Sequence, residues 1–581
     1  MRFVMAIVAF VVAAALVVLG FAQRTILLGP DSVAESVSTS AAPLTLIGGD
    51  ALSARAGRQS LLVTGSGTVF TAYGRTADVL AWVGDAAHNV VSVDAETGGL
   101  VAKSVQGTED VVPDPRGSDL WLEEFSQESW LRSTLNLDSG YTVLIASDGT
   151  RPAPSAITIS WPLDNSTPWA GPLILGGIVI ALVGVGIYLW ALQHLRRSRG
   201  PRRKTPKLPK PPSAPRYKPS QLAIDSTPAR GRRSARKPFT AIVALGVTTV
   251  LLSGCSAAYW PDLDNPAATE SSPKATESTT ADIMFPPAVT VPQLEAIVAR
   301  VATVINDADA QRNVDLLTTR AAGPTLELRQ TNYAIRGADS SVAPLAAVSM
   351  SAPTTVLPQA TDSWPRTVMA VLPDADPAKP QQMMVLLQDS PRQNYRLHYL
   401  IALANKQEVP FASAMVGAPA VPPDSTFTVM APEDVAPAYG EILMNGSSSA
   451  FYDLFDNEKD SLQVQFGAEY KAGVVAALPP EAVMSFGDAA QTGLVLALAT
   501  GESGAVVATN VNEYVNVTPK AAGGTVSPAG QVKALSGLAS STRGIQATYG
   551  YQLLFFVPPV TENGKIVLLG YTQGLVAAKE L

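Results

Sequence analysis

The sequence predicts a multidomain membrane protein with a mainly-β part near the N-terminus, transmembrane helices, and an α+β part in the C-terminal half. Its 581 residues are enough for about three or four domains. Hydrophobic residues make up 47% of the chain and charged residues only 16%, and the excess apolar content lies mainly in three uncharged runs. The segments between these runs have the residue spacing of strands or of amphipathic helices.

The first apolar run, Val4–Ala22, follows Arg2 and contains no charge. It approaches the roughly 20 residues that cross a bilayer, whereas the apolar core of a secretory signal has about 7 to 15. We therefore expect residues 1–23 to be an N-terminal transmembrane anchor or a signal, with length favouring the anchor. Small residues around Phe21 leave cleavage open.

The second run predicts a transmembrane helix over residues 170–192. Aromatic residues lie near both ends of this run, as they do at membrane interfaces, and Arg196, Arg197 and Arg199 follow it directly. These arginines place the end of the helix in the cytoplasm and residues 24–169 outside. The helix also carries a stripe of small residues, which either packs against another helix or reflects the frequency of glycine in membrane helices: Gly177, Ala181 and Gly184.

Residues 193–237 read as a basic, proline-rich cytoplasmic linker. Between Arg196 and Lys237 there are fifteen Lys or Arg and one acid, Asp225, so this stretch carries +14 and the remainder −21 of the net −7. A position between two apolar runs favours the positive-inside rule over nucleic-acid binding. The prolines favour an extended spacer over a docking motif for a partner domain.

The third apolar segment, residues 238–254, ends at the single cysteine of the chain. Basic residues precede it, and its last residues are Leu252, Ser253 and Gly254, followed by Cys255. The segment resembles the lipobox of bacterial lipoproteins, which implies a lipid on Cys255 and a cut before it, with the acyl chains as anchor. The internal position departs from that family, and an uncleaved third helix is the alternative. Residues 255–285, rich in Ser, Thr and Pro, read as a flexible tether.

Residues 24–169 are expected to form an extracytoplasmic, mainly-β domain. Short apolar runs separated by Gly, Asp and Pro predict strands of an antiparallel β-sandwich. They include Leu61–Thr64, Asp78–Val83, Tyr141–Ala146 and Ala156–Trp161.

The C-terminal half predicts two extracytoplasmic α+β domains, residues 286–425 and 426–581. Helical spacing over Val291–Arg336 precedes strand-like runs, and a second helix starting near Pro432 precedes another set of strands. In element order both halves resemble the curved-sheet cones of cystatin-like and nuclear-transport-factor-two-like domains. Through Gly74–Val83 and Gln330–Arg336, the whole chain resembles uncharacterised actinobacterial membrane proteins with a C-terminal domain of unknown function. Some of these proteins carry the label glycosyl transferase.

No catalytic motif is evident. A single cysteine excludes an internal disulfide, and we expect no metal and no cofactor. Several weaker matches are interpreted as chance or structural features, with His398 expected on a solvent face. They are the Asp-x-Asp pairs Asp262/Asp264, Asp307/Asp309 and Asp374/Asp376, the Ser-x-x-Lys match Ser271–Lys274, and His398. Five aromatic residues are interpreted as core rather than pocket lining: Tyr333, Trp364, Phe451, Tyr452 and Phe455.

We therefore expect a non-enzymatic cell-envelope protein that presents extracytoplasmic binding or scaffolding domains. Its expected partners are the lipid bilayer and other envelope proteins, not nucleic acid. The alternative is an enzyme of envelope sugar or peptidoglycan metabolism, of glycosyl-transferase type, without a recognisable motif. A lipid-anchored solute-binding protein is less favoured, because each C-terminal unit is too small for two hinged lobes.

Overall fold

The computed structural model describes the chain except for residues 164, 199–284, 405–410, 459, 490–492 and 502. The described residues form two compact units. One contains the helices α1 (Arg2–Thr25) and α4 (Ala170–Ser198); the other combines residues 34–160 with the C-terminal half. The third apolar segment and the tether lie outside the described residues.

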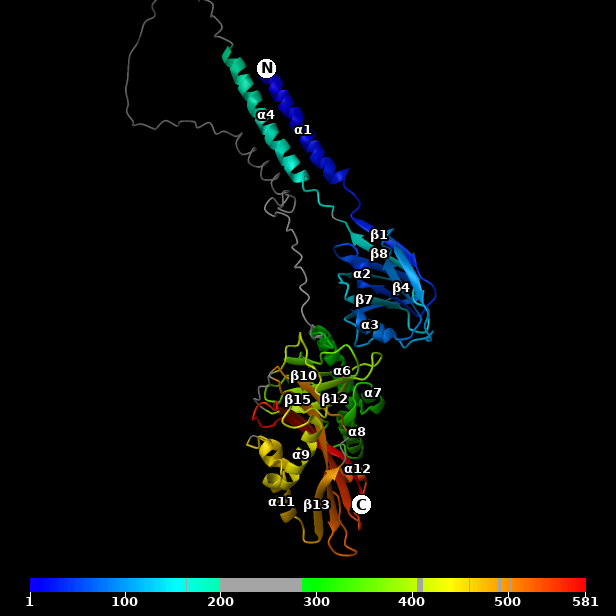
Figure 1. The fold of residues 1–581 in the computed structure, drawn as a ribbon, viewed down its shortest axis with the longest axis vertical. Helices are drawn as coiled ribbons and strands as arrows, with labels where there is room; N and C mark the ends of the chain where they lie inside the picture. Colours follow the sequence, from blue (N-terminus) through cyan, green and yellow to red (C-terminus); the bar gives the residue numbers. More distant parts are fainter. Residues whose placement is uncertain (164, 199–284, 405–410, 459, 490–492, 502) are drawn as a thin grey trace, which may run out of the picture. The chain divides into compact units, whose positions relative to one another are not determined.

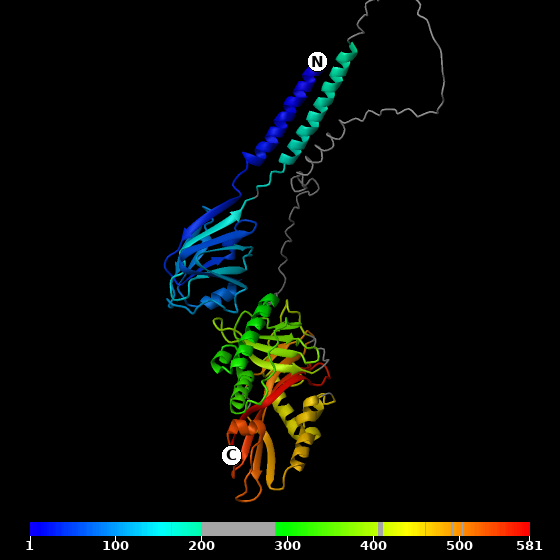
Figure 2. The same cartoon turned by 180° about the vertical axis from the view of Figure 1, so that it is seen from behind.

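Helices α1 and α4 lie side by side and antiparallel (Figures 1 and 2). The ring of Phe3, near the start of α1, contacts that of Tyr188 near the end of α4, with centroids 5.9 Å apart. A Cβ built on Gly177 would meet Val17 Cγ2 at 2.6 Å and the Ala13 carbonyl oxygen at 2.9 Å. The small-residue stripe on α4 is therefore where α1 packs. By length and composition, Phe3–Thr25 and Ala170–Arg196 could each cross a membrane.

Residues 32–162 form a mixed eight-stranded sheet with two short helices. Strand β2 runs parallel to β4 and antiparallel to β7, so a purely antiparallel arrangement is wrong at this point. The elements are β1 (Ser32–Ser38), β2 (Leu44–Gly48), α2 (Gly49–Leu52), β3 (Gln59–Arg75), α3 (Thr76–Val83), β4 (His88–Val93), β5 (Leu100–Val105), β6 (Glu123–Leu135), β7 (Tyr141–Ala146) and β8 (Ala156–Pro162).

The segment expected as a strand at Asp78–Val83 is instead the helix α3. Its buried apolar residues are Val79, Trp82 and Val83, at helical intervals of three and four. Asp78 lies in the first turn, where an acid is favourable beside the unpaired N–H groups of a helix. A short apolar run does not distinguish the two structures by itself.

The C-terminal half is built around one nine-stranded sheet. Its first set of elements is α6 (Val291–Gln311), α7 (Val314–Thr318), α8 (Gly323–Ala338), β9 (Thr355–Pro358), β10 (Arg366–Leu372), β11 (Gln382–Gln388) and β12 (Arg396–Leu403). The second set is α9 (Pro432–Asn445), η2 (Gly446–Ser448), η3 (Tyr452–Leu454), α10 (Ser461–Phe466), α11 (Ala468–Ala476), β13 (Ala482–Ala489), β14 (Leu496–Ala499), β15 (Ala505–Pro519), α12 (Gly530–Ser536), β16 (Ile545–Val557) and β17 (Val567–Glu580).

This sheet is curled, nearly closed and barrel-like: residues on one face of strands that are far apart in the sheet share a single core. On β10, Val368 and Ala370 face the helices α6–α8, whereas Met369 joins a second core together with Leu554 of β16. Phe555, next along β16, packs against α9 on the outer face. The helix-then-strand order expected for each half is confirmed, and the two halves share this one sheet through pairing of β12 with β17.

Candidate functional site

The residues expected to carry lipidation, Leu252, Ser253, Gly254 and Cys255, lie outside the described residues. The same holds for Asp262 and Asp264 and for the Ser271–Lys274 match.

In the two Asp-x-Asp pairs that the structure describes, the aspartates bond to groups of the fold itself. Asp309 is buried in an ion pair with Arg329 and accepts a hydrogen bond from the Tyr333 hydroxyl at 2.6 Å. Asp374 and Asp376 accept backbone N–H groups two residues further on, as aspartates in turns do. Among the described residues, no group of three or more His, Cys, Asp or Glu side chains could hold a metal ion.

The solvent-facing placement expected for His398 is wrong, because its strand β12 is covered on both faces. His398 is 5% exposed, and its ring packs so closely over Gly323 that a Cβ there would clash with the ring Cε1. Its Nε2 accepts the Leu494 N–H at 3.2 Å, and its Nδ1 is buried without a hydrogen-bond partner. Burial lowers the pKa of His398 to about 4.

Four of the five aromatic residues expected in a core pack in or beside the cores of the C-terminal half, and the fifth packs against residues 34–160. Tyr333 and Phe455 are buried in the cores of the two C-terminal halves, and Phe451 and Tyr452 pack at the edge of the second core. Trp364 instead packs against the apolar core of residues 34–160.

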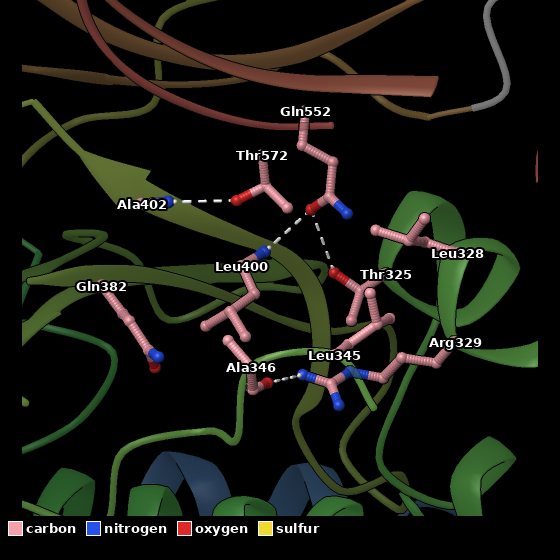
Figure 3. A pocket seen from close by; sticks show the side chains of 10 residues that line it. All are labelled: Thr325, Leu328, Arg329, Leu345, Ala346, Gln382, Leu400, Ala402, Gln552 and Thr572. Atoms are coloured by element: carbon pink, nitrogen blue, oxygen red, sulfur yellow. Dashed lines mark hydrogen bonds between the residues drawn. The ribbon is translucent and has the colours of Figure 1, made fainter. Parts of the chain in front are cut away.

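A small pocket of about 80 Å³ lies between the helix α8 and the strands β12, β16 and β17 (Figure 3). Strands β12 and β17 pair only at Ala402 and Leu403, and side chains bond to the backbone around this short pairing. The Gln552 Oε1 accepts the Leu400 N–H at 2.9 Å, and the Thr572 hydroxyl accepts the Ala402 N–H at 3.1 Å. The pocket is therefore a seam of the sheet whose polar groups serve the fold.

A larger pocket of about 210 Å³ is walled by aromatic rings from α10, α11, β13 and β16. Its lining includes Phe466, Tyr470, Phe486, Tyr549 and Tyr551. A buried ion pair joins Lys471 Nζ to Glu513 Oε1 at 2.6 Å on its wall, and burial raises the pKa of Glu513. Ring faces beside a charge pair suit non-covalent binding of a small or protruding group.

The most extensive polar arrangement joins residues 34–160 to the C-terminal half, and we call it the acid–arginine interface. At its centre is Asp119, which has no exposed surface. Its carboxylate pairs with Arg320 at 2.5 Å and with Arg300 at 2.9 Å. It also accepts the backbone N–H of Tyr395 at 2.8 Å, so three separate segments of the C-terminal half converge on one acid.

Two further backbone contacts hold Asp119 from the same side. The Asp119 N–H donates to Asn394 Oδ1 at 2.9 Å, and the Asp119 carbonyl accepts the side-chain amide of Gln293 at 2.7 Å. Gln293 is also the third residue of α6, where its side chain and that of Thr290 form a capping box. The start of α6 is therefore tied directly to the loop that carries Asp119.

Asp78 of α3 is the second buried acid of the acid–arginine interface. Its carboxylate pairs with Arg366 Nη2 at 2.7 Å and with Arg75 Nε at 2.8 Å. The Arg75 guanidinium also donates to the carbonyl oxygens of Pro287 and Ala288, at 2.7 and 3.0 Å. Arg366, fully buried itself, lies over the Trp364 ring at 3.7 Å.

Arg392 completes the acid–arginine interface at the C-terminal end of α3. Its guanidinium donates to the carbonyl oxygens of Trp82 and Val83, both at 2.8 Å, and pairs with Glu109 at 2.7 Å. The last carbonyls of a helix have no partner inside the helix and carry partial negative charge. A cation from the C-terminal half therefore caps a helix of residues 34–160.

Local sequence pattern does not reveal the acid–arginine interface. The sequence does contain one indication of it: Asp78 lies in an otherwise apolar run, and an acid in such a run is buried only when it is paired. The partners cannot be found by spacing, since Asp78 and Arg366 are 288 positions apart. Arg75, Asp78 and Trp82 all belong to Gly74–Val83, one of the two stretches in which the chain resembles uncharacterised actinobacterial membrane proteins.

Together these features define a multidomain protein with two helices apolar enough to span a membrane and a β domain locked onto a C-terminal α+β domain. Residues 286–580, half of the chain, match the family described as "Domain of unknown function (DUF8094)", and the chain belongs to this family. The expected C-terminal domain of unknown function is confirmed. No curated protein and no solved structure matches the chain.

Proposed function

We propose that the chain is a cell-envelope protein that presents one rigid binding or scaffolding unit outside the membrane. The observation that carries this proposal is the acid–arginine interface, which fixes residues 34–160 against residues 286–580 through buried charges. Buried charges that are paired and hydrogen-bonded hold the parts that they join in one arrangement. Such an arrangement suits a platform whose surfaces must keep their spacing.

The same contacts support the topology. Antiparallel α1 and α4, with arginines after α4, favour a hairpin whose loop, residues 24–169, is outside. Parts that share buried ion pairs must share a compartment, so residues 286–580 belong outside too. The chain between residues 199 and 284 then has to return across the bilayer, and its sequence offers one apolar run for this, Phe239–Leu252.

This run supports the lipoprotein part of the proposal. Phe239–Leu252 has fourteen residues, short of the roughly 20 that span a bilayer but typical of a signal core. A diacylglycerol thioether on Cys255 would then anchor the C-terminal half beside α1 and α4. We also propose that each C-terminal half resembles a cystatin-like or nuclear-transport-factor-two-like cone. The N-terminal domain would likewise resemble a β-sandwich.

The aromatic pocket is the binding surface that we assign to this function. It lies in the second half of the C-terminal domain, and the Tyr470 side chain on its wall is 48% exposed. Among the described residues no arrangement favours the alternative of an envelope sugar enzyme.

A photo-crosslinking amino acid at Tyr470, activated in intact cells, tests this function. We expect a discrete crosslinked envelope component that is lost when Tyr549→Ala removes a wall of the pocket. Lys103→Ala, an exposed change on β5, is the matched control and should keep the product. Absence of any product at Tyr470, combined with sugar transfer by the purified chain from an activated donor, would favour the enzyme instead.

A further inference from the structure

We infer that residues 34–160 and the domain of residues 286–580 are obligate binding partners that stay together when the chain between them is cut. The DUF8094 domain of this protein is, on this view, a receptor for the acidic face of its own N-terminal domain. The inference rests on the proposed function only in placing a natural cut before Cys255. The partnership itself follows from the contacts.

The contacts are complementary in charge. The C-terminal half contributes the guanidinium groups of Arg300, Arg320, Arg366 and Arg392. Residues 34–160 contribute the carboxylates of Asp78, Asp119 and Glu109 that meet them. Opposite charges facing each other across a surface fix its register and exclude wrong partners.

The central contacts, around Asp119 and Asp78, are also buried, which distinguishes a permanent interface from a passing one. Asp119 and Arg366 have no exposed surface and Asp78 is 3% exposed. Trp364 adds an aromatic anchor, since it packs against the core that contains Val79, Trp82 and Trp121. Buried aromatic and arginine anchors are the residues that carry most of the binding energy in protein interfaces.

The receptor surface is preorganised by the fold of the C-terminal half. The three groups on Asp119 come from α6, from the loop after α7, and from the loop before β12. The Arg320 guanidinium is held in place by donating to the Tyr395 carbonyl at 3.2 Å as well. Groups that do not have to be ordered on binding lose less entropy, so the affinity between the separated parts should be high.

The consequence is a two-part complex. A cut before Cys255 would leave the C-terminal half joined to the hairpin of α1 and α4 by the acid–arginine interface as well as by its own lipid. Acid–arginine contacts would then position the lipoprotein relative to a membrane protein made from the same chain.

The test uses the purified full chain in lipid nanodiscs, with Cys255→Ala to block natural processing. A specific protease site is inserted in the Ser/Thr-rich tether, between Ser271 and Thr279, so that the C-terminal fragment contains no apolar run. After cutting, an affinity tag on the N-terminus holds the nanodisc while the C-terminal fragment is washed. Retention then reports the interface alone and is independent of membrane orientation, lipidation and ligand.

We expect the fragment to stay bound in the parent chain and in Asp114→Asn, which changes an exposed pair with Arg116 in the same loop. Asp119→Asn and Asp78→Asn should each weaken retention by at least about a hundredfold, because each acid pairs with two guanidinium groups, of which at least one is buried and loses its counter-charge. Arg392→Gln, at the partly exposed rim, should weaken it less and guards against misfolding of the first two variants. Release of the parent fragment as fast as the Asp119→Asn fragment, or equal retention by all variants, would overturn the inference.

Discussion

We expect the buried histidine of β12 to make the protein less stable in acid. Burial lowers the pKa of His398 to about 4, against about 6.5 for an exposed ring. Its Nε2 accepts the Leu494 N–H, so a proton added there would replace a hydrogen bond with a repulsive contact between two donors. The native state therefore requires the neutral ring.

The sign and size of the effect follow from linkage. Above about pH 6.5 both folded and unfolded chains carry a neutral ring, and the contribution of His398 does not vary with pH. Between pH 6.5 and 4 the unfolded chain binds a proton that the folded chain does not, so stability falls as the pH falls. The shift from about 6.5 to about 4 corresponds to a loss of about 3 kcal/mol by pH 4.

The assay compares denaturant unfolding of the chain and of His398→Gln from pH 7.5 to 4. Glutamine can accept the Leu494 N–H but does not titrate, so the difference between the two curves isolates this ring. The chain has three histidines, so labelled-histidine NMR can also follow the His398 titration directly. Parallel curves for the two proteins, or a titration of His398 near pH 6.5, would refute the reasoning.

Three further predictions concern other contacts. Gly177→Ile should separate α1 from α4 and abolish cysteine crosslinking between them, whereas Gly186→Ile, where an added Cβ meets nothing within 4 Å, should not. Tyr395→Phe should leave the free energy of unfolding unchanged or raise it by about 1 kcal/mol, because its buried hydroxyl has no partner; a loss of more than about 1 kcal/mol in denaturant unfolding would contradict this. Gln552→Leu should cost about 1–3 kcal/mol in the same assay, since it leaves the buried Leu400 N–H unpaired, and a neutral result would show that the sheet seam does not need it.

Local sequence pattern was sufficient to predict long helices and strands that keep a regular apolar spacing. The helix α6 and the strand β16 lie where apolar spacing predicts them. The helix buries a continuous apolar stripe, and the strand buries both faces from Tyr551 to Phe555. The strand predicted at Asp78–Val83 is a helix, because a run of six residues fits a short strand as well as it fits less than two helical turns. The parallel pairing of β2 with β4 depends on a crossover that no local signal encodes.

The candidate sites were less predictable, because they are made by residues far apart in sequence. The acid–arginine interface joins Asp119 to Arg320 across 201 positions, and its residue types occur equally on solvated surfaces. Burial of His398 depends on Gly323 packing over its ring, a contact between different elements. In contrast, the helix-packing role of Gly177 could be anticipated, since membrane helices approach closely at small residues.

The central claim is that residues 34–160 and 286–580 form one unit on the outer side of the membrane. Single cysteines in a Cys255→Ala background test it directly: Lys103→Cys on β5, Lys533→Cys on α12, and Ser213→Cys in the basic segment. The first two positions are exposed, and a membrane-impermeant maleimide applied to intact cells should label both and leave the third unlabelled until the cells are opened. Labelling of Lys103→Cys without Lys533→Cys in intact cells would place the two parts on opposite sides and contradict the account.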